Sequence, residues 1–517
     1  MFFTLTASAR NRAAFFILFI LFGAPALQAQ IMQKARVELP MNEPGIEKFK
    51  AISVGEEGLI LYRRIYALGD DQIELIKMDT ALHENWKGFM TINKNLTLLQ
   101  AYRGRESIFM LLRDRASTGN FVILMARISS GMYLAYEIKN LIPFTATEFV
   151  VTDQAAFIGG NYNYRPLVLY FNFGSKRSKI LPGFFNETGE LNQLKSYDDG
   201  SVDIIVNARN LERRKALWIR SYDPSGDLVK TIVINPGEKK NLIFGRSIKL
   251  ANGEEVVAGV YGRFPDYSRG IFLTVINPAG EYIIDYYNFA NLKNFFSYMK
   301  AKRQKRVKER IERKTIRGKK IKFNYRFLIH DLIPYKNQFI MTGEAFYPHY
   351  VFPNQGTYPM TMRTMPGYYG GMQGGNTSTM VFDGYQYTHA VIIGFNVNGK
   401  LLWDNSFEIN EKKTMQLEQF VRVKPEKDRI VMMYLFDNAL RAKIIRGSEV
   451  LEGKHKDPLK TNQGSEGLVV KNIESEYLDY WYADNFFAYG VQRLQGNTGG
   501  SQRIFFINKI AYQVDTN

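Results

Sequence analysis

Short apolar runs separated by polar turns recur along most of this chain. One pattern repeats: an apolar strand that ends in Asp or Asn, a turn that contains Gly, and a second apolar strand. It occurs around Gly226, Gly280 and Gly399, with looser copies at Gly131 and Gly174 and with Leu82 at the glycine position of the first copy. Asp or Asn followed by Gly between alternating apolar runs is typical of a β-hairpin.

The spacing of these turns predicts a repeat protein. From residue 82 to residues 131, 174, 226 and 280 the steps are 49, 43, 52 and 54 residues, and four-stranded propeller blades repeat every 40–50 residues or so. The next step, from 280 to 399, is 119 residues, and it falls to 47 when two segments of 34 and 38 residues without strand character are left out. We interpret these segments, residues 291–324 and 350–387, as insertions in a regular repeat.

The first unit has the layout of a whole blade, with strands expected at residues 49–54, 59–66, 72–78 and 84–90. Counting onward places eight units near residues 49–90, 97–140, 145–186, 190–235, 241–290, 324–410, 415–457 and 467–514. The last unit shows three clear strands, and residues 34–39 can supply the fourth, which would close the ring and remove the free sheet edges. The sequence therefore predicts an all-β fold, a β-propeller of four-stranded blades, with eight blades favoured over seven; an irregular pair of β-sandwiches is the alternative.

The first 29 residues have the character of an export signal. Arg10 and Arg12 precede an apolar stretch from residue 13 to residue 22, and small residues follow up to Ala29. An apolar stretch of about ten residues is too short to cross a bilayer, which takes roughly 20. We therefore expect a signal peptide at 1–29, rather than a retained anchor, and a single domain from 30 to 517 that is exported to the periplasm.

The sequence offers little for catalysis or metal binding. It has no cysteine, which excludes disulfides and thiolate chemistry. Its histidines stand singly and lack the spacing of a metal site, and the sequence contains neither a P-loop nor a nucleophile elbow. The methionines 360, 362, 365 and 372 could suit copper, but an adaptable contact surface or a low-complexity segment explains them better. We expect no catalytic residue, cofactor or metal, although the acidic residues are numerous enough for a carboxylate pair in the central channel.

Most of the net charge lies in one insertion. The chain carries +18, and residues 293–322, with fourteen Lys or Arg and two Glu, contribute +12. Phe295, Met299, Val307 and Ile311 are spaced as on one face of a helix, so a basic amphipathic helix is predicted over 291–324. Such a helix suits an anionic membrane surface or an acidic partner, and the export signal argues against nucleic acid. A solvated helix that only packs on its own blade is the simpler alternative.

Topology places both insertions on one face. In an antiparallel blade, the loop between the second and third strands and the connection to the next blade leave from the same edge. The other loops of this face are rich in Arg and Tyr, which are enriched at binding hot spots, although solvated loop tips have a similar composition. The predicted partner-binding residues are Lys302, Arg303, Lys305, Arg306, Lys308, Arg310, Arg313, Tyr164, Arg165, Arg213, Arg214, Arg263, Tyr267, Arg269, Tyr358, Tyr368 and Tyr369.

Residues 382–408, FDGYQYTHAVIIGFNVNGKLLWDNSFE, resemble exported propeller-type proteins of the Bacteroidota envelope. In size, export signal and apparent architecture the chain is similar to the periplasmic plug subunit of the type 9 secretion translocon, which closes the periplasmic mouth of an outer-membrane pore. The resemblance implies a periplasmic protein and carries over no functional residue. Since the sequence stops directly after Val514, we do not expect the C-terminal sandwich domain of type 9 cargo.

These features predict a non-catalytic periplasmic propeller associated with the outer membrane. Its Arg- and Tyr-rich face would dock an envelope protein complex, an outer-membrane pore or an anionic membrane surface; no oligomeric state is predicted. The alternative is a glycan-binding or glycan-degrading propeller enzyme with its site at the mouth of the channel. A buried pair of carboxyl groups at the channel would favour that alternative.

Overall fold

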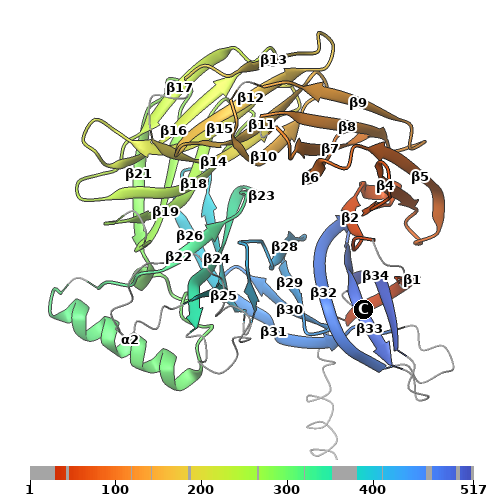
Figure 1. Cartoon of the computed structure of the whole chain (residues 1–517). Helices are drawn as coiled ribbons and strands as arrows, with labels where there is room; N and C mark the ends of the chain where they lie inside the picture. Colours follow the sequence, from red (N-terminus) through yellow and green to blue (C-terminus); the bar gives the residue numbers. More distant parts are fainter. Residues whose placement is uncertain are drawn as a thin grey trace, which may run out of the picture.

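The computed structural model describes residues 30–513 except 42–45, 118, 141, 184–187, 265–266, 320, 352–380, 410–411, 462–468 and 496–500. Eight antiparallel sheets stand around a ring, and in each the chain begins at the inner strand and moves outward (Figure 1). Seven of the sheets have four strands, and the sixth blade has six. The predicted eight-bladed β-propeller is therefore confirmed.

The strands of the first four blades keep close to the predicted units. Blade one has β2 (Lys50–Ser53), β3 (Leu59–Ile65), β4 (Asp71–Met78) and β5 (Glu84–Ile92). Blade two has β6 (Leu96–Arg103), β7 (Ser107–Asp114), β8 (Phe121–Arg127) and β9 (Tyr133–Ile138). Blade three has β10 (Thr145–Val151), β11 (Ala155–Tyr162), β12 (Arg165–Asn172) and β13 (Arg177–Ile180), and blade four has β14 (Gly189–Ser196), β15 (Val202–Arg209), β16 (Lys215–Tyr222) and β17 (Leu228–Ile234).

The second half of the ring follows the same order. Blade five has β18 (Asn241–Lys249), β19 (Glu255–Gly262), β20 (Gly270–Ile276) and β21 (Tyr282–Asn288). Blade six has β22 (Arg326–Ile329), β23 (Ile333–Tyr335), β24 (Gln338–Val351), β25 (Val381–Asn396), β26 (Leu401–Glu408) and β27 (Lys413–Thr414). Blade seven has β28 (Arg422–Pro425), β29 (Ile430–Phe436), β30 (Ala439–Arg446) and β31 (Glu449–Pro458), and blade eight has β32 (Val469–Tyr482), β33 (Asn485–Gln495), β34 (Ser501–Gln513) and β1 (Gln30–Pro40).

The repeated hairpin is the turn between the third and fourth strands of a blade. One residue of this turn is left-handed, with φ of 69° at Leu82, 71° at Gly131, 75° at Gly226, 89° at Gly280 and 74° at Gly399. Glycine adopts this conformation without a steric penalty because it has no Cβ. In blade three the left-handed residue is Lys176, with φ of 55°, and not Gly174.

The two ends of the chain close the ring. β1 pairs antiparallel with β34, from Gln30 opposite Gln513 to Pro40 opposite Ile504, so the predicted fourth strand of the last blade is confirmed and extends beyond 34–39. Between blades one and eight, Leu61 packs with Phe487 and Phe505 in one hydrophobic cluster. Seven further clusters fill the other junctions between neighbouring blades. Burial of apolar surface at every junction stabilises the closed ring without disulfides.

The two insertions are shorter than predicted. The helix α2 spans only Ala301–Ile316, so Phe295 and Met299 precede it and do not belong to a helical stripe. The reason is that residues 292–299 pack into the junction of blades five and six. There a side chain accepts two of the backbone N–H groups, which therefore form no hydrogen bonds within a helix. The ends of the predicted loop 350–387 are also strand, because β24 pairs with β25 as far as Tyr350 opposite Phe382 and Val351 opposite Val381.

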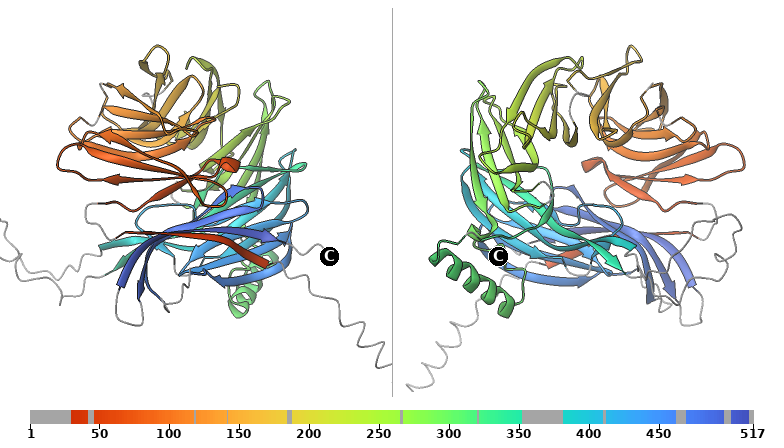
Figure 2. Two further views of the ribbon diagram at one scale, coloured as in Figure 1. Left: turned by 90° about the vertical axis from the view of Figure 1, so that its right-hand side faces the viewer. Right: turned by 60° about the vertical axis from the view of Figure 1, so that its left-hand side comes forward.

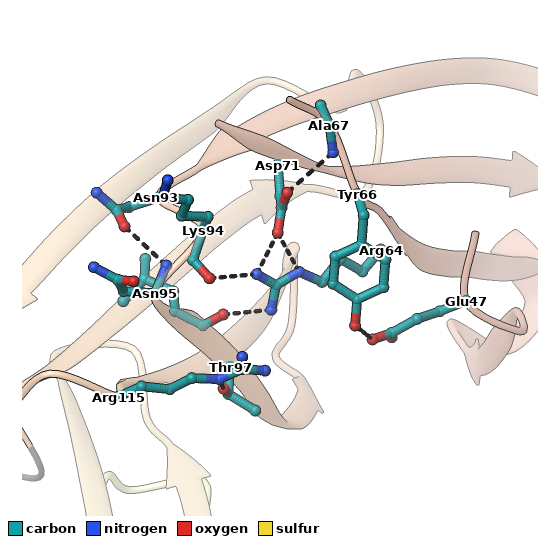
Figure 3. A network of polar contacts seen from close by, with 11 residues as sticks. Glu47, Arg64, Tyr66, Ala67, Asp71, Asn93, Lys94, Asn95, Thr97 and Arg115 are labelled. Carbon is teal, nitrogen blue, oxygen red and sulfur yellow. Dashed lines mark hydrogen bonds and ion pairs between the residues drawn. The ribbon is translucent and has the colours of Figure 1, made fainter. Parts of the chain in front are cut away.

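A buried arginine fixes one corner of the ring (Figure 3). Arg64 in β3 donates from Nε to Asp71 at 2.8 Å, and its Nη2 donates to the carbonyl oxygen of Lys94 at 2.9 Å. A further bond goes to the carbonyl oxygen of Leu96. Only 3% of the Arg64 residue is exposed. The cation thus joins the loop that ends at Asp71 to the connection between blades one and two.

Candidate docking face

The basic insertion is held by a buried anchor between blades five and six. Phe295 and Phe296 are 0% and 1% exposed and belong to the cluster shared by these blades. The Asp404 carboxylate in β26 accepts the backbone N–H groups of Lys293 at 2.9 Å and Asn294 at 2.7 Å. These contacts fix the start of the insertion on the outer strand of blade six.

An aromatic stack completes the anchor. The ring of Tyr298 lies parallel to the imidazole of His389 in β25, with centroids 3.7 Å apart and an angle of 4° between the planes. His389 is fully buried, and burial lowers its pKa to about 3, so the imidazole is neutral at physiological pH. The Tyr298 hydroxyl lies 3.3 Å from that of Tyr325, on the returning leg of the insertion. Both legs are therefore tied to each other and to the blade.

The helix α2 itself projects from the rim of the ring, beside blades five and six (Figures 1 and 2). No residue of α2 is buried; Val307 and Ile311 are partly buried and pack on the cluster between these blades. All seven cations predicted in the helix are exposed: Lys302, Arg303, Lys305, Arg306, Lys308, Arg310 and Arg313. The helix thus presents its charge to solvent, and its apolar contact with the ring is small.

Some charges of α2 oppose its stability, although Arg313 and Lys314 lie in the last turn, where cations are favourable. Lys302, Arg306, Arg310 and Lys314 follow one another at i,i+4 spacing, where like charges repel. The first turn contains no acidic residue, although it carries Lys302 and Arg303 at the positive end of the helix dipole. Within the described part of the chain, no ion pair joins a cation of α2 to a carboxylate. Nothing in the ring therefore neutralises these cations.

The loop between β19 and β20 lies at the base of this helix. Ser268 and Tyr325 exchange backbone hydrogen bonds of 2.8 and 3.1 Å, which joins the loop to the returning leg of the insertion. Tyr267 is 43% exposed, and the guanidinium of Arg326 lies 5.1 Å from the centre of its ring. The predicted residues Tyr267 and Arg269 flank Ser268 and therefore lie beside the returning leg of the insertion, and Arg263 belongs to the same loop.

The other predicted residues lie farther around the ring. Tyr164 and Arg165 occupy the turn between β11 and β12, and Tyr164 is 86% exposed with φ of 60°. Arg213 and Arg214 occupy the equivalent turn of blade four, where Arg214 lies 3.3 Å from Glu212. No contact links these two turns to α2 among the residues described. Tyr358, Tyr368 and Tyr369 lie outside the described residues.

The structure also contains a buried pair of acids, in β15 and β19. Asp203 is 0% and Glu255 6% exposed, and the Nζ atom of Lys249 lies 2.8 Å from Asp203. Burial, followed by the negative charge of Asp203, raises the pKa of Glu255 to about 7. A cavity of about 480 Å³ opens nearby on the opposite face of the ring, lined by turns of blades two to four that include Arg103, Asp153 and Tyr197. Neither acid lines this cavity.

Sequence reasoning missed the parts of this face that act through packing. The adjacent pair Phe295 and Phe296 inside a strongly basic segment was the available signal for an anchor, since large aromatic side chains contribute most when they are buried. The partners Asp404 and His389 lie about 100 residues away in sequence. In the described part of the chain no group of three or more His, Asp or Glu residues could hold a metal. Among these residues, no helix is long and apolar enough to cross a membrane.

Comparison with known proteins gives structural neighbours of low similarity, on which no argument about this chain is based. No protein-family model and no curated protein matches the chain. The propeller domain of the Trilobed protease from Pyrococcus furiosus is 8% identical, with a TM-score of 0.36, and the alignment covers 79% of this chain and 98% of that one. The Dos1 propeller is 8% identical, with a TM-score of 0.39 and coverage of 90% and 95%. An apocarotenoid oxygenase from Synechocystis is 8% identical, with a TM-score of 0.28 and coverage of 44% and 57%.

Proposed function

We propose that this chain is a non-catalytic docking module of the periplasm that attaches to an envelope protein complex at the outer membrane. One observation carries the proposal: α2 displays seven exposed cations on a firmly anchored base, and none is paired with a described carboxylate. The export signal read from residues 1–29 supports the periplasmic location. The chain resembles the plug subunit of the type 9 translocon, and on this ground we propose an outer-membrane pore as its partner.

In this arrangement the cations of α2 supply long-range attraction, and a neighbouring loop supplies the direct contacts. Exposed cations attract an acidic surface over a distance of about 8 Å at physiological salt, and such steering raises the rate of association more than the affinity. Tyr267 and Arg263, in the loop that contacts the returning leg of the insertion, then supply residue types that carry binding energy when water is excluded. The buried anchor fixes the direction in which the charges point, so little conformational entropy is lost on binding.

The rival function, glycan binding or hydrolysis, predicts a buried pair of carboxyl groups at the channel, and Asp203 and Glu255 are such a buried pair. Neither of them lines the cavity on that side of the ring, and Asp203 is paired with Lys249. The docking function is therefore the one that we favour.

The test is photo-cross-linking in intact cells, with a cross-linking amino acid at position 306 or 310 of α2 and, as a control, at the exposed position 176 of blade three. We expect one outer-membrane protein to be captured from the two helix positions and not from position 176. With the cross-linking residue kept at position 306, the variant K302Q/R310Q/K314Q should lose this product, as should cells washed with salt of about 0.5 M before irradiation.

A matched variant controls for net charge. K50Q/K139Q/K176Q/K239Q removes four exposed lysines outside the insertion and should keep the cross-link. Recovery of the wild-type chain without a partner from all positions would contradict the docking function. Capture of anionic lipid alone would replace the protein partner with a membrane surface.

A further inference from the structure

The face of the ring opposite α2 carries charge of the opposite sign. It is formed by the turns that join the first to the second strand and the third to the fourth strand of each blade. In blades one to five these turns contain eleven Asp or Glu against Arg105 and Lys176, a net of −9. In the same blades the loops and connections of the α2 face, without the insertion, contain nine Lys or Arg and five Asp or Glu, a net of +4. Since the chain as a whole is basic, its composition does not explain an acidic face.

The acidic turns form one continuous arc. Blades one to five follow one another along the upper part of the ring in Figure 1, and all ten of these turns lie within the described residues. The equivalent turns of blades six to eight carry three acids and four cations. The negative charge is therefore confined to the turns of blades one to five on this face, which we call the acidic arc.

Most acids of the arc have no counter-ion. Asp153 lies 3.6 Å from Arg105, and Asp227 lies 2.7 Å from Lys179 in β13. Among the described residues, the other nine acids of the arc form no ion pair with Lys or Arg. Six of these nine are exposed: Glu56, Glu57, Glu106, Asp198, Asp199 and Glu281. The strand residues that directly border the turns add four cations and two acids, which leaves a net of −7.

Turn geometry does not require this charge. Asp79, Asp199 and Asp223 each accept backbone N–H groups within their own turns, at 2.8 to 2.9 Å. Asn277 and Asn396 accept the equivalent N–H groups in the turns of blades five and six. A neutral side chain thus serves the turn equally well, and the acids need another explanation.

The middle of the arc is hollowed. The cavity of about 480 Å³ between the turns of blades two, three and four has five charged residues in its lining: Arg103, Arg105, Asp153, Asp198 and Asp199. Arg105 and Asp153 are paired with each other, which leaves two aspartates against Arg103. A volume of this size can admit a side chain of a partner, and the remaining charge favours a cationic one.

We propose that the acidic arc is a second interaction surface, which binds a lysine- and arginine-rich segment of a partner protein. Charge complementarity argues for this occupant, because acids without counter-ions attract cations over about 8 Å at physiological salt. Complementary potentials also steer the encounter and reject acidic partners. The ring would then link an acidic partner on the α2 face to a basic partner on the other. The arc contains no residue of α2, so the two surfaces can fail or hold independently.

The test is selection of displayed random peptides of about twelve residues on the full chain. E56Q/E106Q/D198N/E281Q removes four exposed charges of the arc, and D70N/E137Q/E212Q/E238Q removes four exposed charges elsewhere among blades one to five. We expect the enriched peptides to be rich in Lys and Arg and to bind the second variant like the wild type. They should bind the first variant at least about tenfold more weakly, a loss of about 1.4 kcal/mol.

Two further measurements separate a binding surface from general attraction and from self-association. A scrambled version of each enriched peptide should bind more weakly than its parent, because the turns hold their charges at fixed positions. Equal binding of scrambled and parent peptides, equal binding by the two variants, enrichment of acidic or neutral peptides, or no enrichment would overturn the proposal. In sedimentation of the purified chain, self-association lost in both E56Q/E106Q/D198N/E281Q and K302Q/R306Q/R310Q/K314Q would assign the arc to α2 of a second copy and would also overturn it.

Discussion

Arg64 and the cations of α2 carry the same charge and have opposite environments. Arg64 is buried at the corner of blades one and two and donates to Asp71 and to two backbone carbonyl oxygens. Arg306 and Arg310 in α2 are exposed, and neither is paired with a carboxylate that the structure describes. In the first case the protein partners replace the water that the guanidinium loses on burial; in the second, the guanidinium keeps its water and remains free to meet another molecule.

The difference shows how a basic protein divides its charge. Within the ring, arginine and lysine stabilise loops and junctions, so substitution there should change folding. In the insertion several cations repel one another, although Arg313 and Lys314 are favourably placed in the last turn of the helix. Local repulsion that no carboxylate of the ring offsets is expected at functional sites. Measurements of stability at both places can therefore test whether the two groups of charges have different roles.

The largest effect is expected at Arg64. Arg64→Ala leaves the Asp71 carboxylate, itself 3% exposed, without its counter-ion and leaves two backbone carbonyl oxygens without a donor. Removal of one partner of a buried pair costs about 3–5 kcal/mol, and urea denaturation followed by tryptophan fluorescence should show this loss. Arg115→Ala removes an exposed arginine that donates to Thr97 at 2.6 Å (Figure 3) and should cost no more than about 0.5 kcal/mol. Equal losses in the two variants would contradict the distinction.

A buried charge without full compensation should make stability depend on pH. Burial and the neighbouring Asp203 raise the pKa of Glu255 from 4.5 to about 7, so the folded chain holds this proton more tightly than the unfolded chain. The stabilisation is complete below pH 4.5 and is lost as the pH rises through about 7, with a total of roughly 3 kcal/mol. Urea denaturation at intervals between pH 5 and pH 8 measures the slope.

Glu255→Gln provides the control for this slope, because its amide is neutral at every pH. The difference in unfolding free energy between the wild type and Glu255→Gln should change steadily across this range in favour of the variant as the pH rises. A constant difference would show that Glu255 does not titrate between pH 5 and pH 8. Protonation of Glu255 would then make no contribution to the free energy of unfolding in this pH range.

A smaller loss is expected at the anchor of the insertion. Asp404→Ala removes the acceptor of the two N–H groups of Lys293 and Asn294, which should cost roughly 2 kcal/mol for the unsatisfied groups. Hydrogen exchange of residues 292–300 should accelerate, while that of blades one to four stays unchanged. Asp404→Asn, which keeps one acceptor oxygen, should lose less. Unchanged exchange in Asp404→Ala would mean that the aromatic contacts of Phe295 and Tyr298 hold the anchor alone.

The repeat could be predicted because its signals are local in sequence. The hairpin turns at Gly226, Gly280 and Gly399 each need a left-handed residue, and their spacing sets the size of a blade. The fourth strand of the last blade also followed from counting, since a ring without it would keep an open edge. These features depend on backbone conformation and on the alternation of apolar residues, both of which a single sequence displays.

The anchor could not be predicted, because it depends on residues distant in sequence. Periodicity placed Phe295 on a helix, whereas the structure places it in a junction with His389 and Phe289. The sequence predicts that the α2 cations are exposed. That none of them is paired with a described carboxylate could be learned only from the structure.

The smallest effect on stability is expected where the effect on docking should be largest. K302Q/R306Q/R310Q/K314Q removes three like-charge contacts at i,i+4 spacing, each worth about 0.2–0.5 kcal/mol of repulsion, and leaves Glu309 and Glu312 with their other neighbours. Since α2 makes only a small apolar contact with the ring through Val307 and Ile311, this relief should change the free energy of unfolding of the whole chain by less than about 0.5 kcal/mol. The four-lysine control variant should behave in the same way. A loss of 2 kcal/mol or so in the helix variant, comparable with Asp404→Ala, would show that the α2 cations stabilise the ring after all, and their exposure would then no longer argue for a partner.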